Sequence, residues 1–569
     1  MTITSCNSDD VITEDVTGKP VITLDNSTGV YEVKVGRELT IAPSYLNSQG
    51  AAYEWQIDDR TVATTPSFTH TWNEPGEYYV TLTVTNSYGS AVEEMRVEVV
   101  ELGVPAISLP MEGNSVTILV NTDFKIKPEI TYTQLDDFKV EWTLNGAKVS
   151  DSTEYTFRAD ATGDYAMAVR ASNIDGSTTR EFTIHVVDKL PVNIEFTKPS
   201  YFAESDTRYT FPGRALYIRP IVSGTDATSY SWALDGRPTS VTDDTYMFLS
   251  DTPGEYNVAV TVAGEYTASV KVVVVNATES SRRRAVTGSS EAACNKVYEY
   301  VPAPGQFIGE PASGYSGGES TLAEANAYAE KRMRDGNYVS LGAWGGYIIV
   351  GFDHSVPVNA GVNNIAVQGN AFFNAGTGSG GSNEPGIIYV MQDVNGNGLP
   401  DDEWYELRGS ETGVSTTLQD YAVTYYRPSS SAMGVQWTDN RGNQGTVDYL
   451  KAFHTQPYYY PTWITADSYT LRGTRLEART TQDGGVWNNS AFGWGYADNM
   501  GSDILNAGGA DGEGQRNGFK LENAMNINLS VVNLQYIDFV KIQTGVCSKA
   551  GWIGEVSTEV YAVEDLSIK

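Results

Sequence analysis

The chain has 569 residues, of which 19% are charged, and its formal net charge is −33. This length predicts several domains, and 55 Gly, 35 Tyr and 11 Trp favour a β-rich extracellular protein over a helical cytosolic one. The acidic excess repels phosphate backbones and anionic bilayers, so nucleic acid is excluded as a partner. No apolar run is long enough for a membrane-spanning helix.

The first residues predict a lipid anchor. Ile3-Thr4-Ser5-Cys6 resembles a bacterial lipobox, in which the cysteine is lipidated. The acidic residues Asp9 and Asp10 follow and are similar to the signal that exports Bacteroidetes lipoproteins to the cell surface. We therefore expect Cys6 to carry lipid, residues 1–18 to form a flexible tether, and the protein to be a cell-surface lipoprotein of the outer membrane that meets the membrane only through this anchor. The alternative is an incidental cysteine in a tail.

A repeat of about 90 residues follows the tether. Trp55, Trp142 and Trp232 each stand in a short run of alternating apolar and polar residues that ends in a turn signal. This pattern is typical of a β-strand whose Trp faces a core.

Downstream of each Trp, a Gly turn precedes a Tyr at the start of another alternating strand: Gly76 and Tyr78, Gly163 and Tyr165, and Gly254 and Tyr256. This predicts a sandwich corner, in which the ring covers the core and the hydroxyl bonds back to the backbone. The three repeats resemble PKD domains, which implies immunoglobulin-like sandwiches at residues 19–102, 103–189 and 190–276. The resemblance implies that they act as spacers; direct ligand binding is the alternative.

Residues 277–293 have the composition of a linker, and the basic run from Arg282 to Arg284 is interpreted there as solvated and without function. A C-terminal ligand-binding domain is expected over residues 294–569. It contains one convincing helix, because Thr321 and Glu324 form a capping box and Gly336 can end the helix. The other segments predict strands: 347–352, 364–367, 386–390, 421–425, 539–543 and 556–563. The prediction is an all-β protein: three tandem immunoglobulin-like, PKD-type sandwiches, then a large jelly-roll-like sandwich with one short helix.

Two cysteines lie near the ends of the C-terminal domain. Cys294 and Cys547 are compatible with a disulfide, because the first and last strands of a sandwich often lie side by side. Two buried thiols fit the sequence equally well.

The sharpest chemical motif starts at Asp393. The segment resembles the first half of a calcium loop. It has side-chain oxygens at alternate positions, a Gly for the tight turn and a backbone carbonyl that can bind the ion. We expect a structural calcium ion bound by Asp393, Asn395, Asn397, the carbonyl of Leu399, Asp401 and, as the additional carboxylate, Glu403. Asp402 or a distant carboxylate is the alternative to Glu403. Trp404 stands where a calcium loop usually has its final acid, so the alternative is a hairpin loop without metal.

The sequence offers no catalytic constellation. Its four histidines lack zinc-like spacing, and neither a Gly-x-Ser-x-Gly elbow nor a Cys-His signature occurs. Nothing selects a pair of carboxylates for glycoside hydrolysis. We predict that the protein is not an enzyme.

Aromatic residues concentrate in two loops of the C-terminal domain. Flat rings beside amide groups suit a large planar ligand with a polar rim, although the same residues could fill a sandwich core. The candidate ligand-binding residues are Trp437, Tyr458, Tyr459, Tyr460, Trp463, Trp487, Asn489, Trp494 and Tyr496.

The C-terminal domain also resembles the surface-exposed cobalamin-binding lipoproteins of gut Bacteroidetes, the BtuH type. The resemblance is carried by residues 303–307, 369–372, 393–407, 494–499 and 554–560. It implies capture of cobalamin, vitamin B12, by this domain alone, and delivery to an outer-membrane TonB-dependent cobalamin transporter. The alternative is a calcium-stabilised carbohydrate-binding or adhesin lipoprotein.

Overall fold

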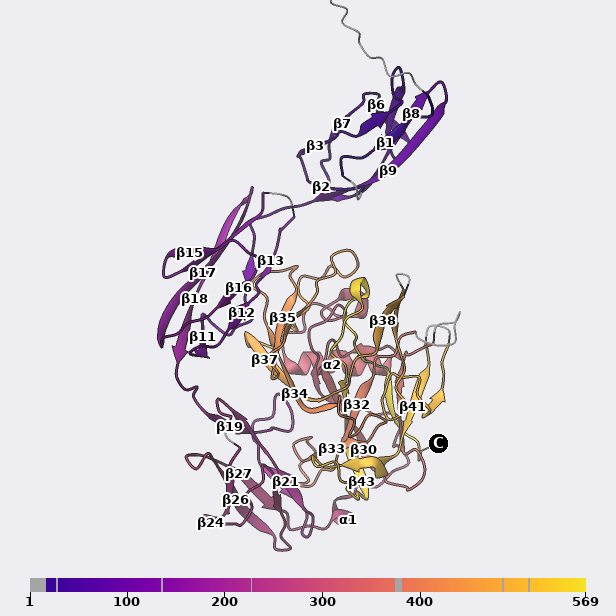
Figure 1. Ribbon diagram of the computed structural model, residues 1–569. Helices are drawn as coiled ribbons and strands as arrows, with labels where there is room; N and C mark the ends of the chain where they lie inside the picture. Colours follow the sequence, from indigo (N-terminus) through magenta and orange to yellow (C-terminus); the bar gives the residue numbers. More distant parts are fainter. Residues whose placement is uncertain are drawn as a thin grey trace, which may run out of the picture.

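The computed structural model in Figure 1 describes residues 17–26, 29–134, 137–226, 228–373, 381–483, 486–509 and 512–568. Three small β-sandwiches, modules 1 to 3, precede a larger β-rich domain, so the predicted all-β fold class is confirmed. Within these ranges no helix has both the length and the apolar character needed to cross a bilayer.

The three modules share one design of strands. Module 1 contains β1 (Val21–Thr23), β2 (Val30–Lys34), β3 (Glu38–Ile41), β4 (Ser44–Leu46), β5 (Ala52–Ile57), β6 (Arg60–Ala63), β7 (Phe68–Thr71), β8 (Gly76–Asn86) and β9 (Gly89–Val100). Module 2 contains β10 (Ile107–Ser108), β11 (Ser115–Leu119), β12 (Phe124–Ile126), β13 (Glu129–Ile130), β14 (Lys139–Leu144), β15 (Ala147–Ser150), β16 (Tyr155–Phe157), β17 (Gly163–Asn173) and β18 (Gly176–Val187). Module 3 contains β19 (Asn193–Phe196), β20 (Arg208–Thr210), β21 (Leu216–Ile218), β22 (Pro220–Ser223), β23 (Tyr230–Leu234), β24 (Arg237–Pro238), β25 (Tyr246–Phe248), β26 (Gly254–Val262) and β27 (Tyr266–Val274).

Each module has the same five-stranded sheet. The strand orders are β2-β9-β8-β5-β6, β11-β18-β17-β14-β15 and β20-β27-β26-β23-β24, and in each the first strand runs parallel to its neighbour. The remaining strands of each module form two short antiparallel pairs. The repeat seen in the sequence is therefore a repeat of topology.

The repeated Trp and Tyr residues lie where the sequence predicts. The three Trp rings are buried, and each indole N–H donates to a carbonyl, those of Thr65, Ser152 and Asp243, at 2.8–2.9 Å. Each corner Tyr donates its hydroxyl to the carbonyl four residues upstream: Tyr78 to Glu74, Tyr165 to Ala161 and Tyr256 to Thr252. The predicted sandwich corners are confirmed, because each buried ring brings its polar atom to a backbone partner.

The C-terminal domain contains several sheets. Its elements are β28 (Lys296–Val301), α2 (Leu322–Arg334), β29 (Val339–Ser340), β30 (Tyr347–Pro357), β31 (Ile365–Gly369), β32 (Gly386–Met391), β33 (Trp404–Leu407), β34 (Leu418–Tyr426), β35 (Val435–Asp439), β36 (Gln444–Val447), β37 (Ser468–Arg475), β38 (Thr480–Asp483), β39 (Val486–Asn489), β40 (Ile504–Asn506), β41 (Gln515–Phe519), β42 (Ala524–Met525), β43 (Tyr536–Thr544), β44 (Glu559–Val560) and β45 (Ala562–Asp565), with the 3-10 turns η1 (Pro311–Ser313), η2 (Leu521–Asn523) and η3 (Gly551–Ile553).

A six-stranded sheet, β28-β30-β43-β32-β33-β42, forms the centre of this domain. Two four-stranded sheets, β36-β35-β34-β37 and β40-β41-β31-β45, accompany it. Of the strands in these three sheets, only β42 is shorter than three residues. Helix α2 begins with the predicted capping box of Thr321 and Glu324, and it buries Ala325, Tyr328 and Ala329. Gly336 follows with a φ of 72°, which explains why a glycine ends the helix.

Modules 2 and 3 contact the C-terminal domain, whereas module 1 extends away from it (Figure 1). From module 2, the Ile107 carbonyl accepts a hydrogen bond from the Ser429 hydroxyl at 2.9 Å. From module 3, Tyr201 donates its N–H to the Tyr347 hydroxyl at 2.8 Å, and Trp404 donates its indole N–H to the Pro199 carbonyl at 2.9 Å. These two modules are thus part of the surroundings of the C-terminal domain.

Candidate functional site

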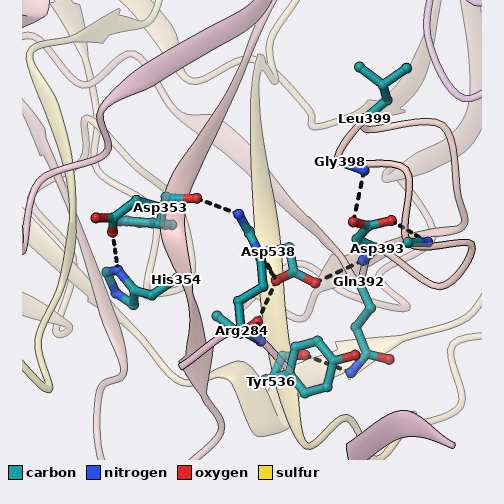
Figure 2. A network of polar contacts seen from close by, with 12 residues as sticks. Arg284, Asp353, His354, Gln392, Asp393, Gly398, Leu399, Tyr536 and Asp538 are labelled. Atoms are coloured by element: carbon teal, nitrogen blue, oxygen red, sulfur yellow. Dashed lines mark hydrogen bonds and ion pairs between the residues drawn. The ribbon is translucent and has the colours of Figure 1, made fainter. Parts of the chain in front are cut away.

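The loop between β32 and β33 has the backbone geometry of a cation loop. The Asp393 carboxylate accepts N–H bonds from Gly396, Asn397 and Gly398 at 2.7–3.1 Å. Gly396 and Gly398 both have a φ of 76°, a conformation in which a side chain would be strained. Figure 2 shows the Asp393 carboxylate with its Gly398 contact.

Three further side chains converge in this loop. The side-chain amides of Asn395 and Asn397 donate to opposite oxygens of the Asp401 carboxylate at 2.9 and 2.8 Å. The Leu399 N–H donates to the Asn397 side-chain oxygen at 2.8 Å, which brings that backbone segment against the same group. Four of the five side chains predicted as ligands therefore belong to one hydrogen-bonded loop.

The fifth predicted side chain, Glu403, is directed elsewhere. It forms an ion pair with Arg208 of module 3 at 2.8 Å, and both side chains are mostly buried. Asp402 is the carboxylate that turns into the loop: one of its oxygens accepts the Val394 N–H at 2.8 Å, and the other has no partner among the described residues. Burial raises the pKa of Asp402 to about 8, and the carboxylates of Asp401 and Asp393 contribute to this rise. The sequence left Asp402 open as an alternative to Glu403, and in the structure it is Asp402 that faces the loop.

A buried carboxylate connects this loop to the segment before the C-terminal domain (Figure 2). Asp538, on the central strand β43, accepts the Asp393 N–H at 2.8 Å and forms an ion pair with Arg284 at 3.0 Å. Arg284 also donates to the Phe352 carbonyl at 2.9 Å. The interpretation of residues 282–284 as a solvated run without a role is therefore wrong for Arg284, because its partner lies 254 positions away in the sequence.

Three of the predicted ligand-binding aromatics are core residues. Tyr459, Tyr460 and Trp463 are 0%, 2% and 3% exposed and belong to the main hydrophobic core of the domain. The tyrosine hydroxyls donate to backbone carbonyls at 2.9 Å, and the Trp463 indole donates to the Tyr300 carbonyl at 3.1 Å. The structure corrects their assignment, since these rings and their polar atoms are already used by the fold. Tyr458, their neighbour, is exposed.

Trp494 is the predicted aromatic residue with the most ligand-accessible position. Its side chain is 39% exposed and borders a hollow of about 450 Å³, called here the Trp494 hollow. The polar residues of its lining include Asn363, Arg408, Asp503, Lys520 and Asn523. The hollow thus joins one indole to amide, cationic and acidic groups, since Glu522 also lines it.

Tyr496 differs from Trp494 although it lies two residues away. It is 3% exposed, and its hydroxyl accepts the Glu411 N–H at 3.0 Å. Its ring packs on Gly409, where an added Cβ would approach the ring within 2.5 Å. Tyr496 supports the loop that carries Trp494, so its ligand-contact assignment is corrected to a packing role.

The other three predicted residues lie at the end of the domain where β36, β39 and η3 meet. Trp437 is half-buried and borders a cavity of about 160 Å³. The Trp487 ring packs on Gly551, whose added Cβ would approach it within 2.7 Å. Asn489 is buried and donates its backbone N–H to the Gly381 carbonyl at 2.8 Å. Trp437 and Trp487 therefore flank the loop 547–555, whereas Asn489 is structural.

A cluster of acids was not anticipated from the sequence. One carboxylate oxygen from each of Glu384, Asp498 and Glu559 lies within 4.8 Å of the others, and Asp498 and Glu559 are buried. The pKa values of all three carboxyl groups lie above their usual range. The largest cause is burial, and the charges of the neighbouring acids in the cluster add to it. Asp498 and Glu559 lie in two of the segments that carry the cobalamin-binding resemblance. This resemblance was the only feature of the sequence that pointed to these two residues.

The two cysteines of the domain are both free thiols. Burial raises the pKa of Cys294 to about 12 and also raises that of Cys547. Of the two arrangements that the sequence left open, the structure has the separate thiols. Cys6 lies outside the described residues.

Comparisons with known proteins concern the N-terminal modules. Residues 19–86 and 104–173 match the family model of the PKD-like domain. Among solved structures, the chain is similar to fibronectin(III)-like modules of Clostridium thermocellum CbhA, to Sidekick-1 immunoglobulin domains 1–5 and to the I-band fragment I67–I69 from titin. The CbhA modules are 16% identical, and the match covers 30% of this chain and 94% of theirs with a TM-score of 0.17. The Sidekick-1 domains are 14% identical, with 45% and 58% covered and a TM-score of 0.19. The titin fragment is 15% identical, with 45% and 98% covered and a TM-score of 0.18.

No curated protein matches the chain. The matched segments coincide with modules 1 and 2, and module 3 repeats their sheet topology. The chain therefore carries N-terminal PKD-like domains.

Proposed function

We propose that the C-terminal domain captures cobalamin at the cell surface and delivers it to an outer-membrane TonB-dependent transporter. The observation that supports this proposal is the Trp494 hollow, because Leu407, Trp494 and Gly495 of its lining belong to segments that resemble cobalamin-binding lipoproteins. The function is binding; no catalytic step is proposed.

The chemistry of the hollow suits a corrin. Corrin has a broad apolar face with a fringe of amides, so its binding site should offer ring surface together with hydrogen-bonding groups. Trp494 supplies an exposed ring, and Asn363 and Asn523 supply amides. Arg408 and Lys520 add donors for amide carbonyls. An open hollow of about 450 Å³ would hold one side of such a ligand.

Anchoring through Cys6 is part of the same proposal. The lipobox-like tetrapeptide and the acids that follow it support an outward-facing lipoprotein, and module 1 would separate the C-terminal domain from the membrane. Proteolysis of intact cells that express the chain with a native signal peptide tests this placement. Full protection in intact cells, with cleavage after lysis, contradicts it.

We also propose that the Asp393 loop binds a structural calcium ion. The fit rests on the carboxylates of Asp393 and Asp401, which lie in one hydrogen-bonded loop, and on the unpartnered buried oxygen of Asp402. The side-chain amides of Asn395 and Asn397 donate to Asp401 here, so these two residues would turn their oxygens inward on binding the ion. Hard oxygen donors are the ligands that calcium prefers, and a cation would relieve the repulsion among the carboxylates. Asp402 replaces Glu403 as the additional carboxylate in this proposal.

Titration calorimetry of the full chain with cyanocobalamin tests the function. Losing a buried aromatic anchor costs about 2 kcal/mol, or roughly thirtyfold in Kd, so Trp494→Ala should weaken binding by this factor. Tyr88→Ala in module 1 is the control, since that ring is also exposed but does not line the hollow.

Three results would separate the alternatives. Binding by the parent that Trp494→Ala leaves unchanged rejects the hollow and retains the function. A parent that ignores cyanocobalamin rejects the function. If that parent instead binds a polysaccharide, a carbohydrate-binding or adhesin lipoprotein replaces cobalamin capture.

A further inference from the structure

The cavity beside Trp437 has features of a binding site that are independent of the Trp494 hollow. It measures about 160 Å³ and lies between the hairpin of β35 and β36 and the loop 547–555. Three aromatic side chains, Trp344, Tyr425 and Trp437, line it. Trp344 and Tyr425 are each 1% exposed, so the fold holds these walls in place before any ligand arrives.

Two acidic residues, Asp448 and Glu555, line the cavity, and Glu555 is the buried one. The side chain is 6% exposed, and one carboxylate oxygen accepts the Gln306 N–H at 2.7 Å. The second oxygen is buried and has no hydrogen-bond partner among the residues that the structure describes. A buried carboxyl with a free oxygen costs stability unless a ligand, an ion or water completes it.

The charged residues of the cavity lining are Asp448, Lys549 and Glu555. Glu559 and Asp448 act on Glu555 and, after burial, contribute to the rise of its pKa. Lys549 also lines the cavity, but it already forms an ion pair with Asp448 at 2.5 Å. Burial raises the pKa of Glu555 to about 8, so a cation in the cavity would favour the ionised carboxylate, whereas an anion would oppose it.

We propose that this cavity binds a small organic ammonium group, with Glu555 as its counter-ion and the three aromatic rings as its walls. Aromatic faces carry negative quadrupole charge and attract ammonium groups, most strongly where water is excluded. A carboxylate with a free oxygen gives the same ligand a direct ion pair. An apolar neutral molecule of equal shape would gain only the contact with the walls.

The test compares choline with its neutral isostere 3,3-dimethyl-1-butanol on the full chain by titration calorimetry or ligand-observed NMR. The charge of an enclosed ammonium is worth about tenfold in Kd or more, so choline should bind at least tenfold more tightly than the isostere. Glu555→Gln should remove most of this preference, and Trp437→Ala should weaken choline binding. Asp467→Asn, which removes an exposed carboxylate, is the charge-matched control and should leave binding unchanged.

The outcomes are distinct. Equal binding of both ligands, no binding of choline, or choline binding that Glu555→Gln leaves unchanged overturns the proposal and leaves water as the occupant of the cavity. Circular dichroism confirms that each variant is folded, and Trp437→Ala provides a readout on a half-buried residue if Glu555→Gln is unstable. Cobalamin binding is measured in parallel, because success or failure there concerns the Trp494 hollow only.

Discussion

The Arg284 guanidinium forms an ion pair with the Asp538 carboxylate at 3.0 Å, and the Asp538 side chain is completely buried. The same carboxylate accepts the Asp393 N–H at the start of the proposed calcium loop. One buried acid on the central strand β43 thus connects the segment that follows module 3 with that loop (Figure 2).

Replacing Arg284 with Gln should destabilise the C-terminal domain. Removing one partner of a buried ion pair leaves an uncompensated charge, and because Arg284 is partly exposed we expect about 2 kcal/mol, below the usual range for fully buried pairs. Arg283→Gln is the control, since Arg283 is the next residue in the chain and its side chain is exposed. Urea unfolding measures both variants, and equal stabilities would contradict the role given to the Arg284–Asp538 pair.

Calcium should raise the Tm of the protein, and excess EDTA should lower it. A ligand at about a hundredfold excess over its Kd stabilises the folded state by about 2.7 kcal/mol. Asp393→Ala should abolish the difference between the two buffers. Glu403→Gln should retain it, because Glu403 is paired with Arg208 in module 3. A Tm that EDTA leaves unchanged in the parent rejects the site, and a loss of response in Glu403→Gln restores Glu403 as a ligand.

Stability should fall as the pH rises from about 4.5 to about 7 through the contribution of Glu406. Burial raises the pKa of Glu406 to about 7, above the value of about 4.3 for an exposed glutamate. The folded state therefore retains a proton that the unfolded state has lost, so stability decreases across this window and levels off above it.

Glu406→Gln measures that contribution. The Tm of the variant relative to the parent should increase between pH 5 and pH 7.5, because the amide cannot ionise. Asp467→Asn provides the comparison with an exposed carboxylate. Parallel Tm curves for the parent and Glu406→Gln would show that Glu406 does not retain its proton in the folded state.

A fragment that begins at residue 294 should be less stable than one that begins at residue 190. The shorter fragment lacks Arg284, the partner of Asp538, and lacks Ser200, whose hydroxyl donates to the buried Glu299 at 2.6 Å. Each loss leaves a buried carboxylate with fewer partners. Thermal unfolding of both fragments checks this, and equal Tm values would support the expectation that the C-terminal domain is self-sufficient.

Much of the fold follows from local patterns. The strand periodicity around Trp55, Trp142 and Trp232 and the turns before the corner tyrosines predict three sandwiches, and the structure has them. The capping box at Thr321 predicts helix α2. These features depend on residues close together in the sequence, so their physical causes can be read from it.

The candidate sites are only partly readable in this way. The Asp393 loop is recognisable because its residues lie within one turn. The pairing of Glu403 with Arg208 depends on another module, so the sequence could not reveal it. Tyr459, Tyr460 and Trp463 have the composition of a binding loop, yet they fill the core, since the same rings serve either purpose.

The sequence by itself determined the repeated modules, their Trp and Tyr anchors, helix α2 and the loop at Asp393, because hydrophobic periodicity, capping and turn chemistry act over a few residues. Only the tertiary structure decided that Arg284 meets Asp538, that Glu384, Asp498 and Glu559 meet one another, and that Glu555 borders an aromatic cavity. Burial and charge pairing join residues far apart in the chain, and no local pattern records which of them will become neighbours.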